Sequence, residues 1–90
     1  MQRRVRIAAS VGLHARPAAL LAKAAAAQAA PVTIAKVVDG VAGDPVDASS
    51  MLGLMSLGAQ HGEEVELSGD EAALDELVAL VEQDLDKAPA

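Results

Sequence analysis

The sequence predicts an α+β fold in which helices cover one face of a mostly antiparallel sheet. Two short segments, Arg4–Ala8 and Glu63–Leu67, alternate polar and apolar residues as half-buried strands do. Two longer segments carry apolar residues at helical spacing, and turn residues separate the second strand from the third. The expected order is strand, helix, strand, strand, short helix, strand, helix. The chain has 90 residues and is 52% hydrophobic, so we expect one domain over residues 1–90.

The N-terminal half is expected to hold the first strand, the first helix and the second strand. In the first strand the alternation places three apolar side chains inward: Val5, Ile7 and Ala9. An alanine-rich helix should follow, with this apolar face: Pro17, Leu20, Leu21, Ala24, and Ala27 or Gln28. Pro31 lies just past the alanine tract and should help to end the helix. Residues 32–38 form the expected second strand.

The connection after the second strand is rich in turn residues. The segment Asp39–Pro45 contains Asp-Gly and Gly-Asp-Pro, and a short third strand is expected within residues 41–47. A short helix over Met51–Leu57 should follow. Ser49 or Ser50 is expected to cap its start, and Gly58 is expected to end it.

The last helix should begin soon after the Glu63–Leu67 strand. Ser68 and Glu71 have the spacing of a capping box. The apolar residues that follow share one helical face, with most acids opposite: Leu74, Leu77, Val78, Val81 and Leu85.

Charge is distributed unevenly along the chain, whose net charge is −6. All thirteen acidic residues lie from Asp39 onward, where Lys87 is the one base. The six other bases precede them: Arg3, Arg4, Arg6, Arg16, Lys23 and Lys36. A basic N-terminal half could steer an acidic or phosphorylated protein partner, although a plain solvated surface can show the same segregation. Nucleic acid is not an expected partner, because the net charge has the wrong sign and no aromatic side chain can stack on bases.

Composition also indicates the cellular compartment. No Cys is present, so a disulfide framework is impossible, which fits a reducing compartment. No apolar run reaches the roughly 20 residues of a membrane span, and the apolar part of the N-terminus is too short for a secretory signal. We therefore expect a cytoplasmic protein without membrane insertion, and neither a metal nor another cofactor.

The residues Gly12–Pro17, at the start of the first helix, carry the candidate chemistry. Gly12 permits a tight turn after the first strand, and His14 is expected at or near the helix N-cap. Pro17 is tolerated because first-turn N–H groups have no intrahelical acceptor. Those N–H groups and the positive end of the helix dipole point at whatever the imidazole carries. Arg16 adds a planar guanidinium that suits a phosphate.

His14 is the candidate nucleophile. A helix N-terminus and a nearby arginine both favour neutral imidazole, which can attack a phosphoryl donor. The helix end and Arg16 would then stabilise the negative charge of a phosphohistidine. A histidine that merely caps the helix is the competing interpretation. A metal site is disfavoured because Arg16 would repel a cation, and the only other histidine, His61, is expected in a solvent-facing loop.

Two motifs together carry a resemblance to a known family. They are Gly12–Ala18, GLHARPA, and Ser50–Gly58, SMLGLMSLG. In this order and spacing they resemble HPr, the histidine-containing phosphocarrier family of the bacterial phosphoenolpyruvate-dependent sugar phosphotransferase system. The resemblance runs from the first strand to the last helix. It implies an HPr-like open-faced β-sandwich, a four-stranded antiparallel sheet covered on one face by three helices, and a phosphocarrier rather than an enzyme.

The resemblance implies roles for the signature residues. His14 matches the histidine that enzyme I phosphorylates on Nδ1, with phosphoenolpyruvate as the source, and IIA domains of sugar transporters then receive the phosphoryl group. Arg16 matches the arginine that attends the phosphohistidine. Three further positions belong to the same phosphate-supporting signature: Gly12, Ala15 and Pro17.

The second motif implies a regulatory residue and a partner surface. Ser50 matches a serine modified in some bacteria by an ATP-dependent kinase, which would add a serine kinase or phosphorylase to the partners. Three side chains match the apolar surface that meets enzyme I and the IIA domains: Met51, Leu52 and Met55. From the helix alone, Ser50 needs no role beyond a cap, and Leu54 and Leu57 are expected in the core. We expect the chain to act as a monomer.

The sequence departs from the family pattern at three places. Val11 stands where a small polar residue usually reaches the phosphate, so Ser10 or a backbone N–H would have to supply that contact. The connection Val37–Pro45 is longer than the common pattern, and we expect the excess in a surface loop. Ser49 stands where lysine is common in kinase-regulated members, which weakens the case for regulation at Ser50.

Two other classes of function are open to this sequence. A regulatory module on the same fold would work through Ser50 and the short helix, but it would not need both His14 and Arg16. An acyl-carrier-like domain would also be small and acidic, with a serine at a helix start. Its fold would be an all-helical bundle, whereas alternating strands flank the segment Asp47–Met51 here.

Overall fold

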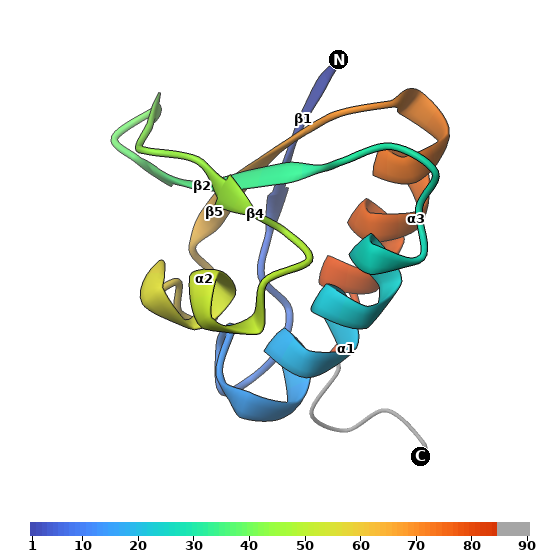
Figure 1. The fold of residues 1–90 in the computed structure, drawn as a ribbon. Coiled ribbons are helices and arrows are strands. Elements are labelled where there is room, and N and C mark those ends of the chain that lie inside the picture. Colours follow the sequence, from blue (N-terminus) through green and yellow to red (C-terminus); the bar gives the residue numbers. More distant parts are fainter. Residues whose placement is uncertain (85–90) are drawn as a thin grey trace.

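The computed structural model, which describes residues 1–84, folds into a sheet on one side and helices on the other (Figure 1). In chain order the elements are β1 (Gln2–Arg6), α1 (Ala15–Ala26), β2 (Thr33–Val38), β3 (Val41–Ala42), β4 (Val46–Asp47), α2 (Met51–Ser56), β5 (Glu64–Ser68) and α3 (Glu71–Val81). The expected order is confirmed, except that the third strand is split into β3 and β4. None of the helices within residues 1–84 has the length and apolar character needed to cross a bilayer.

The sheet is antiparallel throughout, in the order β1-β5-β2-β3, with β4 also paired to β2. β3 pairs near one end of β2, where Val37 faces Ala42, and β4 pairs near the other, where Ile34 faces Val46. The two short strands therefore share one edge of the sheet, which agrees with the four-stranded expectation. The break falls at Gly43–Pro45, where proline has no N–H to give to a ladder.

A tight hairpin joins β2 to β3. Asp39 and Gly40 both have positive φ, 52° and 79°, as a two-residue turn matched to the twist of the strands requires. The valines on either side of this turn, Val38 and Val41, are exposed. The residues of the long connection thus form a surface hairpin and an edge strand, as expected.

The helix α1 lies on the sheet through a face rotated from the expected one. Its buried residues are Pro17, Ala18, Leu21, Ala22 and Ala25. Leu20, which we expected inside, is 37% exposed, and Ala24 is only partly buried. In an alanine-rich helix small apolar residues surround the axis, so the periodicity leaves the direction of the face poorly defined. The helix ends at Ala26, well before Pro31, which therefore does not terminate it.

The start of α3 also differs from the expectation. Ser68 belongs to β5, where it pairs with both Gln2 and Thr33, so it is not available as a cap. Asp70 is the N-cap residue, and its side chain makes no capping hydrogen bond. The buried residues of α3 are Ala73, Leu74, Leu77 and Val81. Val78 is half-buried, and Leu85 lies outside the described residues.

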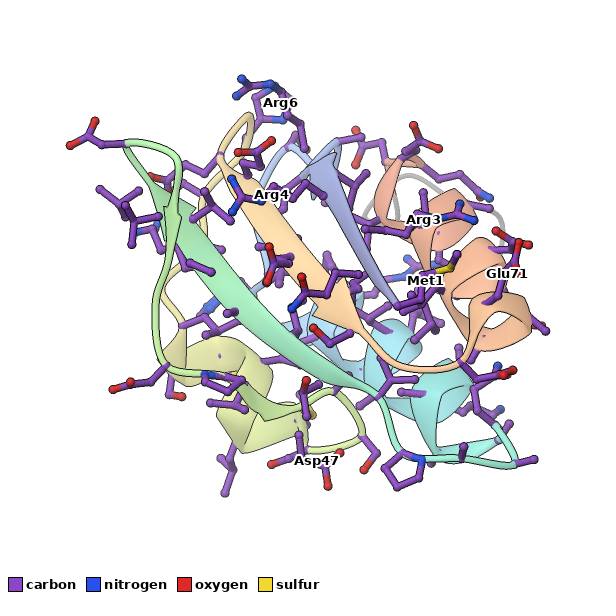
Figure 2. All side chains as sticks on the ribbon, turned by 90° about the horizontal axis from the view of Figure 1, so that it is seen from above. Met1, Arg3, Arg4, Arg6, Asp47 and Glu71 are labelled. Atoms are coloured by element: carbon purple, nitrogen blue, oxygen red, sulfur yellow. The ribbon has the colours of Figure 1, made fainter. Side chains whose placement is uncertain are left out.

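Two of the three arginines of β1, Arg3 and Arg4, are paired with acids. Arg3 turns toward α3 and forms an ion pair with Asp75 at 2.8 Å, whereas Arg4 lies on the open face of the sheet and pairs with Glu66 at 2.9 Å (Figure 2). Because β1 lies beside β5 and packs on α3, the fold places acids from the second half of the chain next to bases from the first. The expected charge segregation therefore disappears at this part of the surface.

Candidate functional site

His14 lies at the N-cap of α1. Its backbone is extended (φ −103°, ψ −173°), its side chain makes no capping hydrogen bond, and the residue is exposed. His14 is thus the N-cap residue by position, and its side chain is not used as the cap. Ala15 and Arg16 are exposed in the first turn, and Pro17 is buried beneath them. Helix geometry leaves the first N–H groups without intrahelical acceptors, so the positive end of α1 lies next to the imidazole.

The loop between β1 and α1 is docked against the loop that precedes β5. Gly12 has a φ of 71°, and its N–H donates to the Ala9 carbonyl at 2.9 Å. The next N–H, of Leu13, donates to the Ala59 carbonyl at 3.0 Å. A Cβ on residue 12 would lie 2.5 Å from the Ala59 oxygen and 2.9 Å from Cα of Gln60. Glycine is therefore required here by both its dihedral angle and its contact.

A hollow of about 280 Å³ lies beside His14. The side chains and backbone that line it come from the first loop, from α2 and from the loop after α2: Val11, Leu13, His14, Met55, Gly58, Ala59 and Gln60. The structure thus brings His14 and Met55 of the second motif to one surface. Val11 is 46% exposed there, and the Ser10 N–H donates to a carboxylate oxygen of Asp84 at 3.2 Å.

Ser50 is the N-cap of α2, and Ser49 is not. The hydroxyl oxygen of Ser50 accepts the Gly53 N–H at 3.0 Å, which is the ordinary bond of a serine cap. A Cβ on residue 53 would lie 3.3 Å from that same oxygen and 3.4 Å from Cβ of Val46, which gives a packing reason for a glycine inside the helix. Two large apolar side chains of α2 are exposed, Met51 (39%) and Leu52 (81%), whereas Leu54 is fully buried and Leu57, just past the helix, is partly buried.

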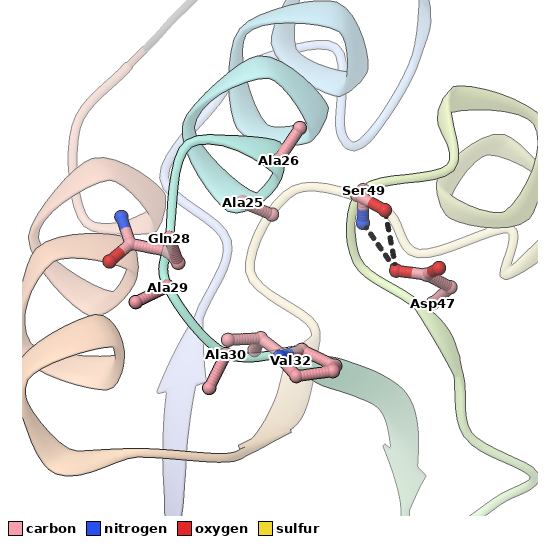
Figure 3. Close-up of a pocket in the computed structure, with 9 residues that line it drawn as sticks. Ala25, Ala26, Gln28, Ala29, Ala30, Val32, Asp47 and Ser49 are labelled. Atoms are coloured by element: carbon pink, nitrogen blue, oxygen red, sulfur yellow. Dashed lines mark hydrogen bonds between the residues drawn. The ribbon is translucent and has the colours of Figure 1, made fainter.

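Asp47 and Ser49 form a turn just before α2 (Figure 3). Ser49 donates both its hydroxyl, at 2.7 Å, and its backbone N–H, at 2.9 Å, to one oxygen of Asp47. These two bonds, the hydroxyl bond first, lower the pKa of Asp47 from its usual value of 3.8. The turn borders a hollow of about 290 Å³ lined mainly by small apolar residues from the end of α1 and from the segment after it.

We expect the Asp47→Ala variant to lose stability relative to the wild type at pH 6, and to lose less of it in acid. A carboxylate with a depressed folded-state pKa stabilises the fold above its unfolded pKa, and this stabilisation is lost as the pH falls through the lower, folded-state pKa. The gap in free energy of unfolding between the two proteins should therefore be constant above about pH 5 and shrink below the usual pKa of Asp. Urea denaturation at a series of pH values measures it, and a gap independent of pH would contradict the assignment.

Sequence reasoning missed a contact of His61 and the role of Glu63. His61 is exposed, as expected, and its Nδ1 lies 3.3 Å from the Ala9 carbonyl oxygen. Glu63 accepts the Gln60 N–H at 2.7 Å. Neither contact has a local sequence signal, because loop geometry decides which donor and acceptor meet. Among the described residues, no three potential His or carboxylate ligands gather as a metal site would require.

Comparison with known proteins decides the family. The chain matches the family model PTS-HPr, described as the PTS HPr component phosphorylation site, over residues 1–83. This chain belongs to the HPr family. It is 48% identical over 92 residues to the phosphocarrier protein HPr of Streptomyces coelicolor, an alignment covering 98% of the chain and 95% of that relative.

Solved HPr structures share the fold. The HPr of Bacillus anthracis is 38% identical, with a TM-score of 0.77 over 90% of this chain and 95% of the other. HPr-C-His from Thermoanaerobacter tengcongensis is 33% identical, with a TM-score of 0.80 over 99% of both chains. The open antiparallel sheet excludes the all-helical acyl-carrier interpretation. As an HPr, the chain is a phosphocarrier of the phosphotransferase system and not an enzyme.

Proposed function

We propose that His14 is the residue that carries the phosphoryl group. The observation that supports this most directly is the exposed imidazole at the N-cap of α1, which makes no capping bond and borders the hollow beside α2. An exposed nucleophile can enter the site of a donor protein and then that of an acceptor protein. Because the chain belongs to the HPr family, we take the donor to be enzyme I and the acceptors to be the IIA domains of the phosphotransferase system.

The transfer step uses Nδ1 of His14. The lone pair of this atom forms the new P–N bond while the bond between phosphorus and the donor breaks, and the donor leaves with its electron pair. The reacting tautomer holds its proton on Nε2. The phosphoryl group of the product carries about two negative charges next to the first turn of α1, whose N–H groups and dipole stabilise it. The ring is a cation until its Nε2 proton passes to solvent. Arg16, in that same turn, adds a permanent positive charge that suits phosphate.

The supporting residues act through the backbone. Gly12 makes the docked turn, Ala15 leaves the first turn of α1 open to the phosphoryl group, and buried Pro17 anchors that turn without needing an acceptor. For Ser50 we propose the cap role alone, since its oxygen already accepts the Gly53 N–H. A serine kinase or phosphorylase is then not needed as a partner. HPr proteins work in the cytoplasm, where we place this chain as a monomer.

The test is phosphorylation in a reconstituted system. The wild-type protein is incubated with enzyme I, magnesium and phosphoenolpyruvate, and its intact mass is recorded before and after acid treatment. We expect the gain of one phosphoryl group, lost in acid as a P–N bond requires. No gain, with the same enzyme I active on another HPr, would refute the proposed function and favour a regulatory module.

We propose that Met51, Leu52 and Met55 form the apolar partner surface. Two leucines of α2, one exposed and one buried, provide the test. Leu52 is 81% exposed, so Leu52→Ala should leave the free energy of unfolding within about 0.5 kcal/mol of wild type. Its affinity for enzyme I should fall by roughly tenfold, because an exposed leucine gains its burial only in the complex.

Leu54→Ala is the matched variant. Leu54 is the one buried residue of α2, so truncation should cost about 2–5 kcal/mol of stability through the cavity that it leaves. Urea denaturation and titration calorimetry with enzyme I measure the two effects. A Leu52→Ala protein that binds enzyme I with wild-type affinity would remove Leu52 from the partner surface.

A further inference from the structure

The loop from Gly58 to Gly62 forms the wall on which the His14 loop rests. Leu13 donates its N–H to Ala59, which is 4% exposed, and the backbone of Gly12 packs against Ala59 and Gln60. A second hydrogen bond closes the other end, where the Gly62 N–H donates to the Ile7 carbonyl at 2.8 Å. The position of His14 therefore depends on the conformation of this loop.

One carboxylate holds that loop in shape. An oxygen of Glu63 accepts the Gln60 N–H at 2.7 Å, while the Glu63 backbone N–H donates to the Gln60 carbonyl at 3.0 Å. The same carboxylate oxygen lies 3.4 Å from the ammonium of Lys36, which also reaches the Gly58 carbonyl at 3.5 Å. The side chains are 39% and 29% exposed, so both keep contact with water. Glu63 and Lys36 thus bridge both ends of the segment that receives Leu13.

The charge state of Glu63 agrees with this role. The bond from the Gln60 N–H lowers the pKa of the Glu63 carboxyl below its usual value, and the neighbouring Lys36 acts in the same direction. The carboxylate is therefore ionised at neutral pH and is the stronger form of the acceptor. Its backbone adds a further tie, since the Glu63 carbonyl accepts the Ile7 N–H at 2.9 Å where β1 ends.

We infer that Glu63 is a positioning residue for phosphoryl transfer, holding the Gly58–Gly62 loop in the shape that fixes His14. The inference rests on the proposed function of His14. Glu63 itself touches neither His14 nor any group in transfer. Its effect passes through the backbone of Gln60 and Ala59 to Leu13, and so to the start of α1.

The experiment compares variants of Glu63 in transfer from phospho-enzyme I. Glu63→Ala removes the acceptor, and its rate at saturating phospho-enzyme I should fall about tenfold, because a small misplacement of a reacting group costs one to two orders of magnitude. Glu63→Gln keeps an amide oxygen at the same reach and should stay within about threefold of wild type. Glu63→Asp keeps the charge but shortens the side chain, so it should resemble the alanine variant.

One further measurement and one control variant distinguish a positioning role from a general loss of stability. Hydrogen exchange of the Gln60 and Leu13 amides should speed up in Glu63→Ala and Glu63→Asp but not in Glu63→Gln. The matched control is Glu66→Ala, within β5, which breaks the 2.9 Å ion pair with Arg4 on the open face of the sheet and should leave transfer unchanged.

Each contrary outcome is distinct. Transfer at the wild-type rate in Glu63→Ala, with the Gln60 amide exchanging faster, would overturn the inference and leave the proposed function intact. Equal slowing in Glu66→Ala would overturn it too, since the effect would then reflect general destabilisation. A wild-type protein that accepts no phosphoryl group would refute the proposed function, and this inference with it.

Discussion

The His14→Ala variant should accept no phosphoryl group from phospho-enzyme I, under conditions in which the wild type gains one. The imidazole is the nucleophile, and alanine offers no lone pair at that point. The fold should survive, because His14 is exposed and its side chain makes no capping bond to lose. We expect the free energy of unfolding to stay within about 0.5 kcal/mol of wild type. Intact mass spectrometry and urea denaturation measure the two quantities.

The control is the other histidine of the chain. His61 lies exposed in the loop before β5, where its ring contacts only the Ala9 carbonyl among the hydrogen bonds of the described residues. His61→Ala should still gain one acid-labile phosphoryl group. An acid-labile gain in His14→Ala would move the phosphorylation site away from His14.

The fold was predictable where the sequence pattern matches a single geometry. Alternation in the first strand places Val5 and Ile7 inward, and both are buried. The Asp39–Gly40 pair predicts the tight hairpin, because few other residues adopt two successive positive φ angles. The face of α1 was not predictable in the same way. Where alanine occurs on every side of a helix, the contact with the sheet selects the face, as the exposure of Leu20 shows.

The candidate site, too, was predictable from the sequence only in part. The residues Gly12 to Pro17 form one continuous stretch, so helix-start chemistry could be read from the sequence. Glu63 lies about fifty residues further on and reaches the site through the backbone of Gln60. No local pattern reports that a carboxylate, through its neighbouring loop, supports a histidine so far away in the sequence. The failed Ser68 capping box has a related cause, because pairing with β1 and β2 holds this residue in a strand.

Gly12→Ala should produce the second large effect, a loss of phosphoryl acceptance of roughly a hundredfold. The added Cβ would lie 2.5 Å from the Ala59 oxygen, which is a backbone atom and cannot rotate away. The loop must therefore move off Ala59 and lose the 3.0 Å bond from the Leu13 N–H. His14 follows directly in the chain, so its imidazole moves with the loop. Rapid-quench transfer from phospho-enzyme I measures the change in rate.

Gly40→Ala distinguishes displacement of the loop from backbone strain. Gly40 has a φ of 79°, close to the 71° of Gly12, but a Cβ there would meet nothing within 4 Å. Both variants carry about 1–2 kcal/mol of strain from left-handed backbone, and only Gly12→Ala adds the collision. Gly40→Ala should therefore lose stability yet transfer at the wild-type rate. If the two variants transferred equally well, contact between Gly12 and Ala59 would not be what positions His14. If both were slow, strain or lower stability would explain the loss without any displacement of the loop.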